Sequence, residues 1–333
     1  MRAFAKPRVG VSKCLGFAAC RYNGAMISDD FVRRLAAHVT FCPVCPEMEI
    51  GLGCPRDPIR VVLAGKELRL MQPATGRDVT EAMRQFADSF LGGLGEVDGF
   101  LLKSRSPSCG LSDVKVYGGP VGNRPQKVGR GFFGGAVLDR FPGAAAADEG
   151  RLRHFTLREH FLTRLFVLAE FREVRRRGAA ADLVGFHAAN KGLLMAYHQS
   201  EMRVLGRIVA NPEKRPWPQV MADYGPHLAR ALARPPRFTS IINVLMHAVG
   251  LVSENLSAGE KAFFLDALQD YRAGKVPLSA ATTLIKSWGV RFGESRLLGQ
   301  SYLAPYPEAL MDIADSGKGR SESASEGAGH VRT

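Results

Sequence analysis

The segment Arg8-Val-Gly-Val-Ser12 is a short apolar run that predicts a β-strand, and two further runs of this kind follow it. They are His38-Val-Thr-Phe-Cys-Pro-Val44 and Asp98-Gly-Phe-Leu-Leu-Lys-Ser104. Between the strands, residues 29–37 and 78–92 have the three- and four-residue apolar spacing of amphipathic helices. Strands that alternate with helices predict a parallel, Rossmann-like α/β sheet.

The apolar pattern changes after Gly143-Ala-Ala-Ala-Ala147, where helical spacing replaces short apolar runs. We expect helices over residues 156–177, 183–209, 238–255, 258–273 and 278–288. The sequence therefore predicts an α/β domain over residues 1–150 and an all-α domain over residues 151–313. Residues 314–333 are rich in Ser, Gly and charge and almost lack large apolar side chains, which predicts a disordered tail.

The composition is that of a globular protein, with 46% hydrophobic and 23% charged residues among 333. No run of eighteen apolar residues occurs, and the first residues lack the apolar core of a signal peptide. We therefore expect a cytoplasmic protein that does not enter a membrane.

The net charge of +13 is shared by both halves of the chain. Such an excess favours a polyanionic partner such as nucleic acid. Charge alone does not identify the substrate.

All six cysteines lie in the first third of the chain, and three of them follow predicted strands. Cys14 comes two residues after the first strand, Cys45 closes the second, and Cys109 follows the third. Loops from different strands of an open parallel sheet meet at the carboxyl edge, so we expect these three thiols to lie together. We assign Cys20 to packing.

Three thiolates without a companion histidine fit a cubane iron–sulfur cluster better than a tetrahedral zinc site. Such a cluster leaves one iron open, and an open iron can take a soft sulfur atom from a substrate. The pair Cys42-Pro-Val-Cys45, with Cys54 as a third ligand, leaves a zinc site as the alternative.

Polar residues accompany the cysteines and are candidates for proton transfer. Glu47 is the nearest carboxylate to the predicted cluster, and Ser104, Ser106 and Ser108 precede Cys109. The glycine-rich residues 129–135 lack the spacing of a dinucleotide or P-loop fingerprint, so we expect turns there and no nucleotide cofactor.

Five ordered motifs within residues 7–140 resemble the thiouracil desulfidase family. They are Val9-Gly-Val-Ser-Lys-Cys-Leu-Gly16, Cys20-Arg-Tyr-Asn-Gly24, Pro43-Val-Cys-Pro-Glu47, Gly76-Arg-Asp-Val-Thr80 and Leu102-Lys-Ser-Arg-Ser-Pro-Ser-Cys-Gly110. The chain departs from the family pattern at Lys13 and in its extra Cys20, Cys42 and Cys54.

The second half is similar to a helical domain often fused behind this family. The matching segments are residues 186–198, 205–209, 243–247 and 300–307. The pairing resembles the two-domain tRNA 4-thiouridine desulfidases. This resemblance implies a 4Fe-4S cluster on Cys14, Cys45 and Cys109, assisted by Glu47 and by one serine, for which we favour Ser106 with Ser104 second. Ser108 adjoins the cluster ligand and is assigned to the turn.

The implied reaction is a non-redox desulfuration of 4-thiouridine in tRNA, which releases hydrosulfide and leaves uridine. The alternatives are a desulfidase of free thiouracil, a zinc-stabilised RNA-binding module without catalysis, and the reverse thiolation.

A base in folded RNA must leave its stack to reach a buried cluster, so a second domain that grips the RNA backbone is expected. The candidates for that grip repeat at helical spacing in the helix predicted over residues 183–209. They are Lys191, His187, His198, Arg203 and Arg207. A merely solvated charged face is the alternative interpretation.

Overall fold

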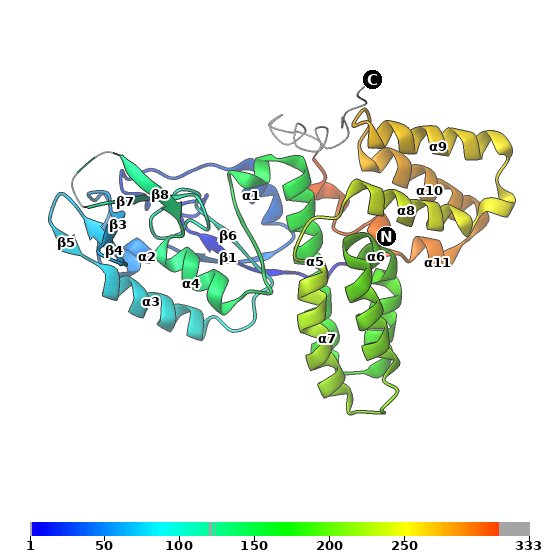
Figure 1. Ribbon diagram of the computed structural model, residues 1–333, viewed down its shortest axis with the longest axis horizontal. Helices are drawn as coiled ribbons and strands as arrows, with labels where there is room; N and C mark the ends of the chain where they lie inside the picture. Colours follow the sequence, from blue (N-terminus) through cyan, green and yellow to red (C-terminus); the bar gives the residue numbers. More distant parts are fainter. Residues whose placement is uncertain (1, 120–121, 123, 313–333) are drawn as a thin grey trace, which may run out of the picture. The chain divides into compact units, whose positions relative to one another are not determined.

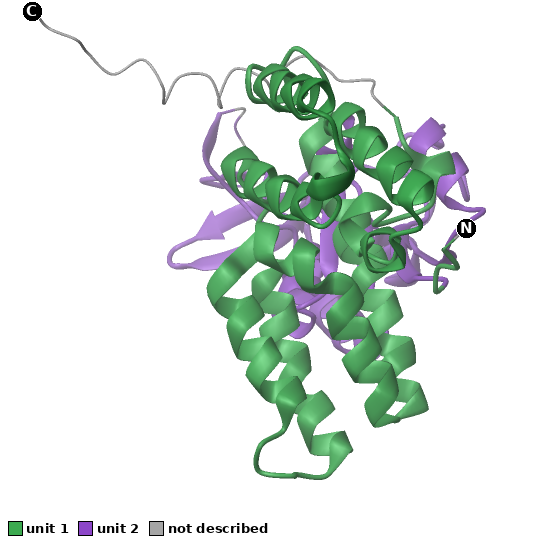
Figure 2. Cartoon of the chain, turned by 90° about the vertical axis from the view of Figure 1, so that its right-hand side faces the viewer, with its two compact units in different colours: residues 1–5, 154–333 green, residues 6–153 purple. Residues whose placement is uncertain are grey.

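A computed structural model describes residues 2–119, 122 and 124–312 of the chain (Figure 1). Contacts divide the chain into two compact units, residues 6–153 and residues 1–5 with 154–333, which Figure 2 colours separately. The predicted tail at residues 314–333 lies outside the described residues. Within the described part, no helix has both the length and the apolar character needed to cross a membrane.

A four-stranded parallel sheet forms the centre of the first unit and confirms the predicted α/β class. Its order is β2 (Thr40–Val44), β1 (Arg8–Ser12), β6 (Gly99–Leu102) and β9 (Ala145–Asp148), and every pairing is parallel. The edge strand β9 was not predicted, because its alanines lack the β-branched and aromatic residues that mark a strand. Because all four strands run parallel, their carboxyl ends lie along one edge of the sheet.

A second sheet of five strands was also missed by the sequence analysis. Its order is β5 (Arg77–Asp78), β4 (Glu67–Gln72), β3 (Arg60–Ala64), β7 (Val114–Tyr117) and β8 (Pro125–Gly129). A tight turn at Gly65, whose φ of 64° suits a residue without a Cβ, joins β3 to β4. Only β3 and β7 pair in parallel.

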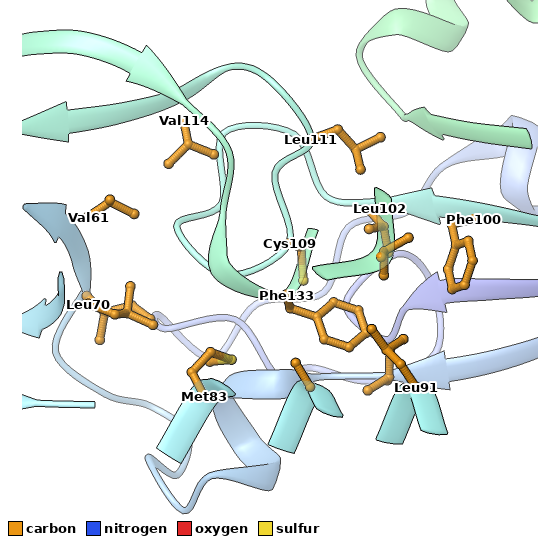
Figure 3. Packing of buried hydrophobic residues seen from close by; sticks show 14 of the residues in the cluster. Val61, Leu70, Met83, Leu91, Phe100, Leu102, Cys109, Leu111, Val114 and Phe133 are labelled. Atoms are coloured by element: carbon orange, nitrogen blue, oxygen red, sulfur yellow. The ribbon is translucent and has the colours of Figure 1, made fainter. Parts of the chain in front are cut away.

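Four helices accompany these sheets: α1 (Asp30–Leu35), α2 (Pro46–Glu49), α3 (Thr80–Gly93) and α4 (Phe132–Arg140). One hydrophobic core joins β-strands from both sheets to α3 and α4 (Figure 3). In it, Val61 of β3 and Phe100 of β6 share a cluster with Met83 of α3 and Phe133 of α4. Cys109 belongs to the same cluster, so the loop that carries it is anchored in the core.

The second unit is helical, as predicted. Its α-helices are α5 (Phe155–Arg177), α6 (Ala180–Ala210), α7 (Trp217–Ala231), α8 (Phe238–Gly250), α9 (Ala258–Arg272), α10 (Leu278–Phe292) and α11 (Ser295–Leu298). Short 3-10 helices occupy residues 151–153 in the first unit and 253–255, 301–303 and 308–310 in this one. Helix α7 was not predicted, because Pro218 and Pro226 interrupt its sequence, although it packs extensively on α6.

Helix α6 breaks at His198, whose φ of −160° and ψ of 92° are not helical. A Cβ built on Gly206 would lie 3.5 Å from the Nε2 atom of His187. In one straight helix these residues would be about 28 Å apart, so the chain turns back at His198. The expectation of one continuous helix over residues 183–209, along which the candidate RNA contacts repeat, was therefore wrong.

Candidate functional site

The carboxyl ends of β1, β2 and β6, three of the four parallel strands, open into one pocket with a cavity volume of about 320 Å³. Each of these strands leads into a different part of the site: β1 into Cys14, β2 into Cys45 and β6 into the loop of residues 103–109. The pocket brings together the six predicted residues of this unit. They are Cys14, Cys45, Cys109, Glu47, Ser104 and Ser106.

The three thiols are buried, with Cys14 9% exposed, Cys45 8% and Cys109 5%. Burial raises the pKa of Cys14, and the neighbouring thiols of Cys109, Cys20 and Cys45 raise it further. Burial also raises the pKa of Cys109 to about 12. The Cys14 and Cys109 thiols are therefore protonated at neutral pH unless a bound cation displaces their protons, as metal coordination does.

The donor set suits a cluster rather than a single ion. Among the described residues, no three His, Cys, Asp or Glu side chains form a group able to hold one metal ion. A cubane cluster binds each cysteine through a different iron atom, so its ligands need not converge on one point. Thiols placed around one pocket, with no histidine in its lining, fit that arrangement.

Glu47 lies in the first turn of α2, directly after the Cys45-Pro46 step. Two nitrogen atoms of Arg56, Nε and Nη2, donate to its Oε2 atom at 2.8 and 2.6 Å. The Nη1 atom of Arg56 donates to the carbonyl oxygens of Cys20 and Gly53 at 3.0 and 2.7 Å. With only 4% of the Arg56 side chain exposed, this ion pair fixes the carboxylate at the pocket wall.

Ser108, not Ser106, makes the direct contact with this carboxylate. The Ser108 hydroxyl donates to Glu47 Oε1 at 2.7 Å, and the Ser106 hydroxyl lies 2.9 Å from that of Ser108. The Ser106 hydroxyl also accepts the backbone N–H of Cys109 at 3.1 Å. Ser106 therefore reaches Glu47 only through Ser108, the residue that the sequence analysis assigned to the turn.

Ser104 belongs to a separate network around Glu149. Glu149 accepts from the Ser104 hydroxyl at 2.7 Å, from the Ser104 backbone N–H at 2.8 Å, and from Lys103 Nζ. Burial opposes ionisation of Glu149, but the hydrogen bonds from Lys103 and Ser104 outweigh it and lower the pKa. The sequence analysis missed Glu149 because it follows β9, a strand that was not predicted. It missed Arg56 because no local sequence pattern connects the loop of Arg56 to a strand end.

Helix α4 supports the cysteine loop from behind, where the sequence analysis expected turns. Backbone N–H groups of Gly131 and Gly134 donate to the carbonyl oxygens of Gly110 and Ser108 at 2.8 and 2.9 Å. A Cβ on Gly134 would lie 2.4 Å from the Gly110 oxygen and 2.5 Å from the Cys109 oxygen. Only a glycine allows the helix to approach the loop this closely.

We expect Gly134→Ala to destabilise the protein by about 1–3 kcal/mol, because backbone atoms of the cysteine loop must move. Gly135→Ala is the matched control in the same helix, since its nearest contact would be 3.6 Å away on the Arg130 side chain. Urea denaturation of both variants measures the difference. Equal midpoints would show that the close approach does not constrain the loop.

The predicted RNA contacts belong to the helical unit. Lys191, His198, Arg203 and Arg207 are exposed. His187 is half-buried, and its Nδ1 atom lies 3.1 Å from the Tyr224 hydroxyl. Burial, followed by the charge of Lys191, lowers its pKa, so His187 is neutral at pH 7 and acts as a packing residue.

Known proteins resemble both parts of the chain. Residues 9–149 match the family described as 2-thiouracil desulfurase, and residues 191–307 match a family described as protein of unknown function DUF1722. The uncharacterized protein YbbK of Bacillus subtilis is 35% identical over 107 residues, which are 30% of this chain and 71% of YbbK. The uncharacterized protein YbgA of Escherichia coli is 28% identical over 153 residues, 45% of this chain and 89% of YbgA.

Among solved structures, that of the 4Fe-4S-dependent thiouracil desulfidase TudS is 30% identical. The match covers 44% of this chain and 93% of TudS, with a TM-score of 0.36. The identity and coverage of YbbK, together with the match of residues 9–149, confirm the resemblance seen in the sequence motifs. Through its α/β unit, the chain belongs to the 2-thiouracil desulfurase family.

Proposed function

We propose that the α/β unit is an iron–sulfur-dependent desulfidase that replaces the sulfur of a thiolated uracil base with oxygen. We further propose that its substrate is 4-thiouridine in tRNA. The observation that carries the first statement is the pocket itself, where cysteines from three strand ends meet a carboxylate fixed by Arg56. Membership of the desulfurase family supports the same reaction.

Cys14, Cys45 and Cys109 would hold the 4Fe-4S cluster. When bound, the cluster would supply one iron atom that none of these three cysteines binds. That iron is a Lewis acid suited to a soft thiocarbonyl sulfur. Lys103, which acts to lower the pKa of Cys14, adds a positive charge beside the thiolates. Glu149 holds that ammonium group in place from behind the pocket wall.

We assign to Glu47 the transfer of protons in the reaction. Addition of water to the thiocarbonyl carbon and departure of hydrosulfide require a group that takes one proton from the water. The carboxylate of Glu47 is held in one orientation, because Arg56 donates to its Oε2 atom and Ser108 donates to its Oε1 atom. Ser108 and Ser106 form a chain of hydroxyls that orients a water molecule or the substrate carbonyl beside Glu47.

The charge of the pocket favours a nucleotide over a free base. Arg56 and Lys103 are paired with carboxylates, but Lys13, Arg21 and Arg105 also line the pocket. In the described part of the chain, no carboxylate pairs with the side chains of these three. A phosphate group can form ion pairs with these side chains, whereas a neutral base cannot.

An aromatic side chain in the same lining suits a base that has left its stack. Tyr22 is 44% exposed, and the guanidinium carbon of Arg21 lies 5.7 Å from the centre of its ring. Aromatic rings and arginine planes are the usual stacking partners of unpaired RNA bases. Tyr22 and Arg21 together support a nucleotide presented by single-stranded RNA.

For the helical unit we propose binding of the tRNA backbone. Removing two exposed charges with Arg203→Ala/Arg207→Ala is expected to weaken tRNA binding and to reduce the slope of log K against log salt by about 2. The control Lys66→Ala/Lys261→Ala removes the same charge from exposed positions elsewhere. Fluorescence anisotropy across a salt series gives both slopes, and equal slopes would contradict the assignment.

The decisive experiment is an anaerobic reconstitution with iron and sulfide, followed by incubation with bulk bacterial tRNA. Loss of 4-thiouridine with release of one hydrosulfide per base supports the proposal. A preference for free 4-thiouracil over tRNA would contradict the tRNA substrate and favour the free-base reaction. Bound zinc without iron would contradict the desulfidase itself.

A further inference from the structure

Cys20 lines the same pocket as the three proposed cluster ligands, although its sequence context suggested only packing. Its side chain is 5% exposed. The Cys20 carbonyl accepts a hydrogen bond from Arg56 Nη1 at 3.0 Å, and the Cys45 sulfur approaches it at 3.7 Å. The backbone of Cys20 is therefore held against Cys45 and against the arginine that anchors Glu47.

The thiol of Cys20 is close to two of the proposed ligands. The Cys20 thiol makes a hydrogen bond with the thiol of Cys45. Cys14 and Cys109 line the same pocket as Cys20 and Cys45. The sulfur atoms of four cysteines thus lie around one pocket.

The other two cysteines serve as internal references, because neither lines the pocket. Cys42 is half-buried within β2. Cys54 is also half-buried, and its thiol donates to the carbonyl oxygens of Ala19 and Arg21 at 3.2 Å each. Only four of the six cysteines can therefore contribute to a cluster in this pocket.

We propose that Cys20 is a fourth and exchangeable ligand of the cluster. Its sulfur binds the iron that Cys14, Cys45 and Cys109 leave open, and yields that position to the sulfur of the substrate. In this exchange one bond between iron and Cys20 breaks and one bond between iron and substrate sulfur forms. Cys20 takes one proton from solvent as it leaves, and no atom changes oxidation state.

Exchange is required for the proposed reaction, on which this inference rests. A cluster held permanently by four cysteines has no free position and transfers only electrons. Cys20 lies in the connection between β1 and α1, where Gly16 and Gly24 have φ values of 94° and 72°. Rotation about its Cα–Cβ bond would withdraw the Cys20 sulfur while the backbone keeps its contacts with Arg56 and Cys45.

The test uses the full chain, reconstituted without oxygen, as wild type, Cys20→Ala and Cys20→Val, with Cys42→Ala and Cys54→Ala as controls. Limited ferricyanide oxidation removes the most weakly held iron, and electron paramagnetic resonance detects the resulting 3Fe-4S cluster. We expect both Cys20 variants to lose this iron about tenfold faster than wild type and controls. Equal rates in all five proteins would overturn the proposal.

A second spectrum tests exchange. Adding 4-thiouridine to the reduced cluster should bring wild type and Cys20→Ala to the same resonance signal, because the substrate sulfur then holds the same iron in both. If the resonance signal of the wild type does not change when 4-thiouridine is added, the proposed exchange is overturned.

The outcomes separate this inference from the proposed function. Protein that binds no iron contradicts both. Turnover of 4-thiouridine with equal iron loss in wild type and Cys20→Ala contradicts the fourth ligand alone. Slower iron loss in wild type without any turnover supports the ligand and contradicts the desulfidase.

Discussion

A Cys109→Ala variant is expected to reconstitute without a stable 4Fe-4S cluster and to desulfurate 4-thiouridine about 10³-fold more slowly than wild type. Three cysteines are the smallest set proposed for the cluster, so the loss of one leaves two iron atoms without a cysteine from that set. The Lewis acid contributes several kcal/mol to sulfur activation, and each 1.36 kcal/mol corresponds to a tenfold change in rate. Iron and labile-sulfide analysis and hydrosulfide release measure the two effects.

Cys109 also belongs to the hydrophobic core, so its replacement needs a control for folding. Cys109→Ser keeps the shape of the side chain but replaces the soft sulfur donor with oxygen, and we expect it to lose iron as Cys109→Ala does. Cys42→Ala removes a cysteine that does not line the pocket and should retain the cluster. Full iron content in Cys109→Ser would contradict the ligand assignment.

The parallel sheet was predictable because its inner strands carry strong local signals. The segment Arg8–Ser12 is a strand with the predicted bounds, since it is apolar and flanked by Pro7 and a turn. Strand β9 has no such signal, because alanine is common in every kind of element. Its strand character comes from pairing with β6, a contact that no local pattern reveals.

The cysteine arrangement could be predicted for a topological reason. Cys14, Cys45 and Cys109 follow three strands of one parallel sheet, and such strands end at the same edge. Arg56 reaches Glu47 from a loop outside that rule, and Ser108 acts through the direction of its side chain. The rule predicts which loops meet, but not which atoms within them touch.

A Glu47→Gln variant is expected to keep its cluster and to lose about two to four orders of magnitude in kcat, which is the usual contribution of a general base to the rate. Glutamine has nearly the shape of glutamate, and its amide oxygen can still accept from Arg56 or Ser108. It cannot take a proton from water at neutral pH. Single-turnover kinetics with tRNA measure the rate of the chemical step, and the iron content confirms that the cluster is intact.

Glu49→Gln is the matched control, because Glu49 is an exposed carboxylate in the same short helix α2 and does not line the pocket. It should leave kcat unchanged. Glu47→Asp keeps the charge but shortens the side chain, which stretches the contacts with Arg56 and Ser108, so we expect an intermediate rate. If Glu47→Gln turns over as fast as Glu49→Gln, Glu47 moves no proton in the slow step. The ion pair with Arg56 would then serve to hold the Cys20 carbonyl and the wall of the pocket, since the same guanidinium group contacts both.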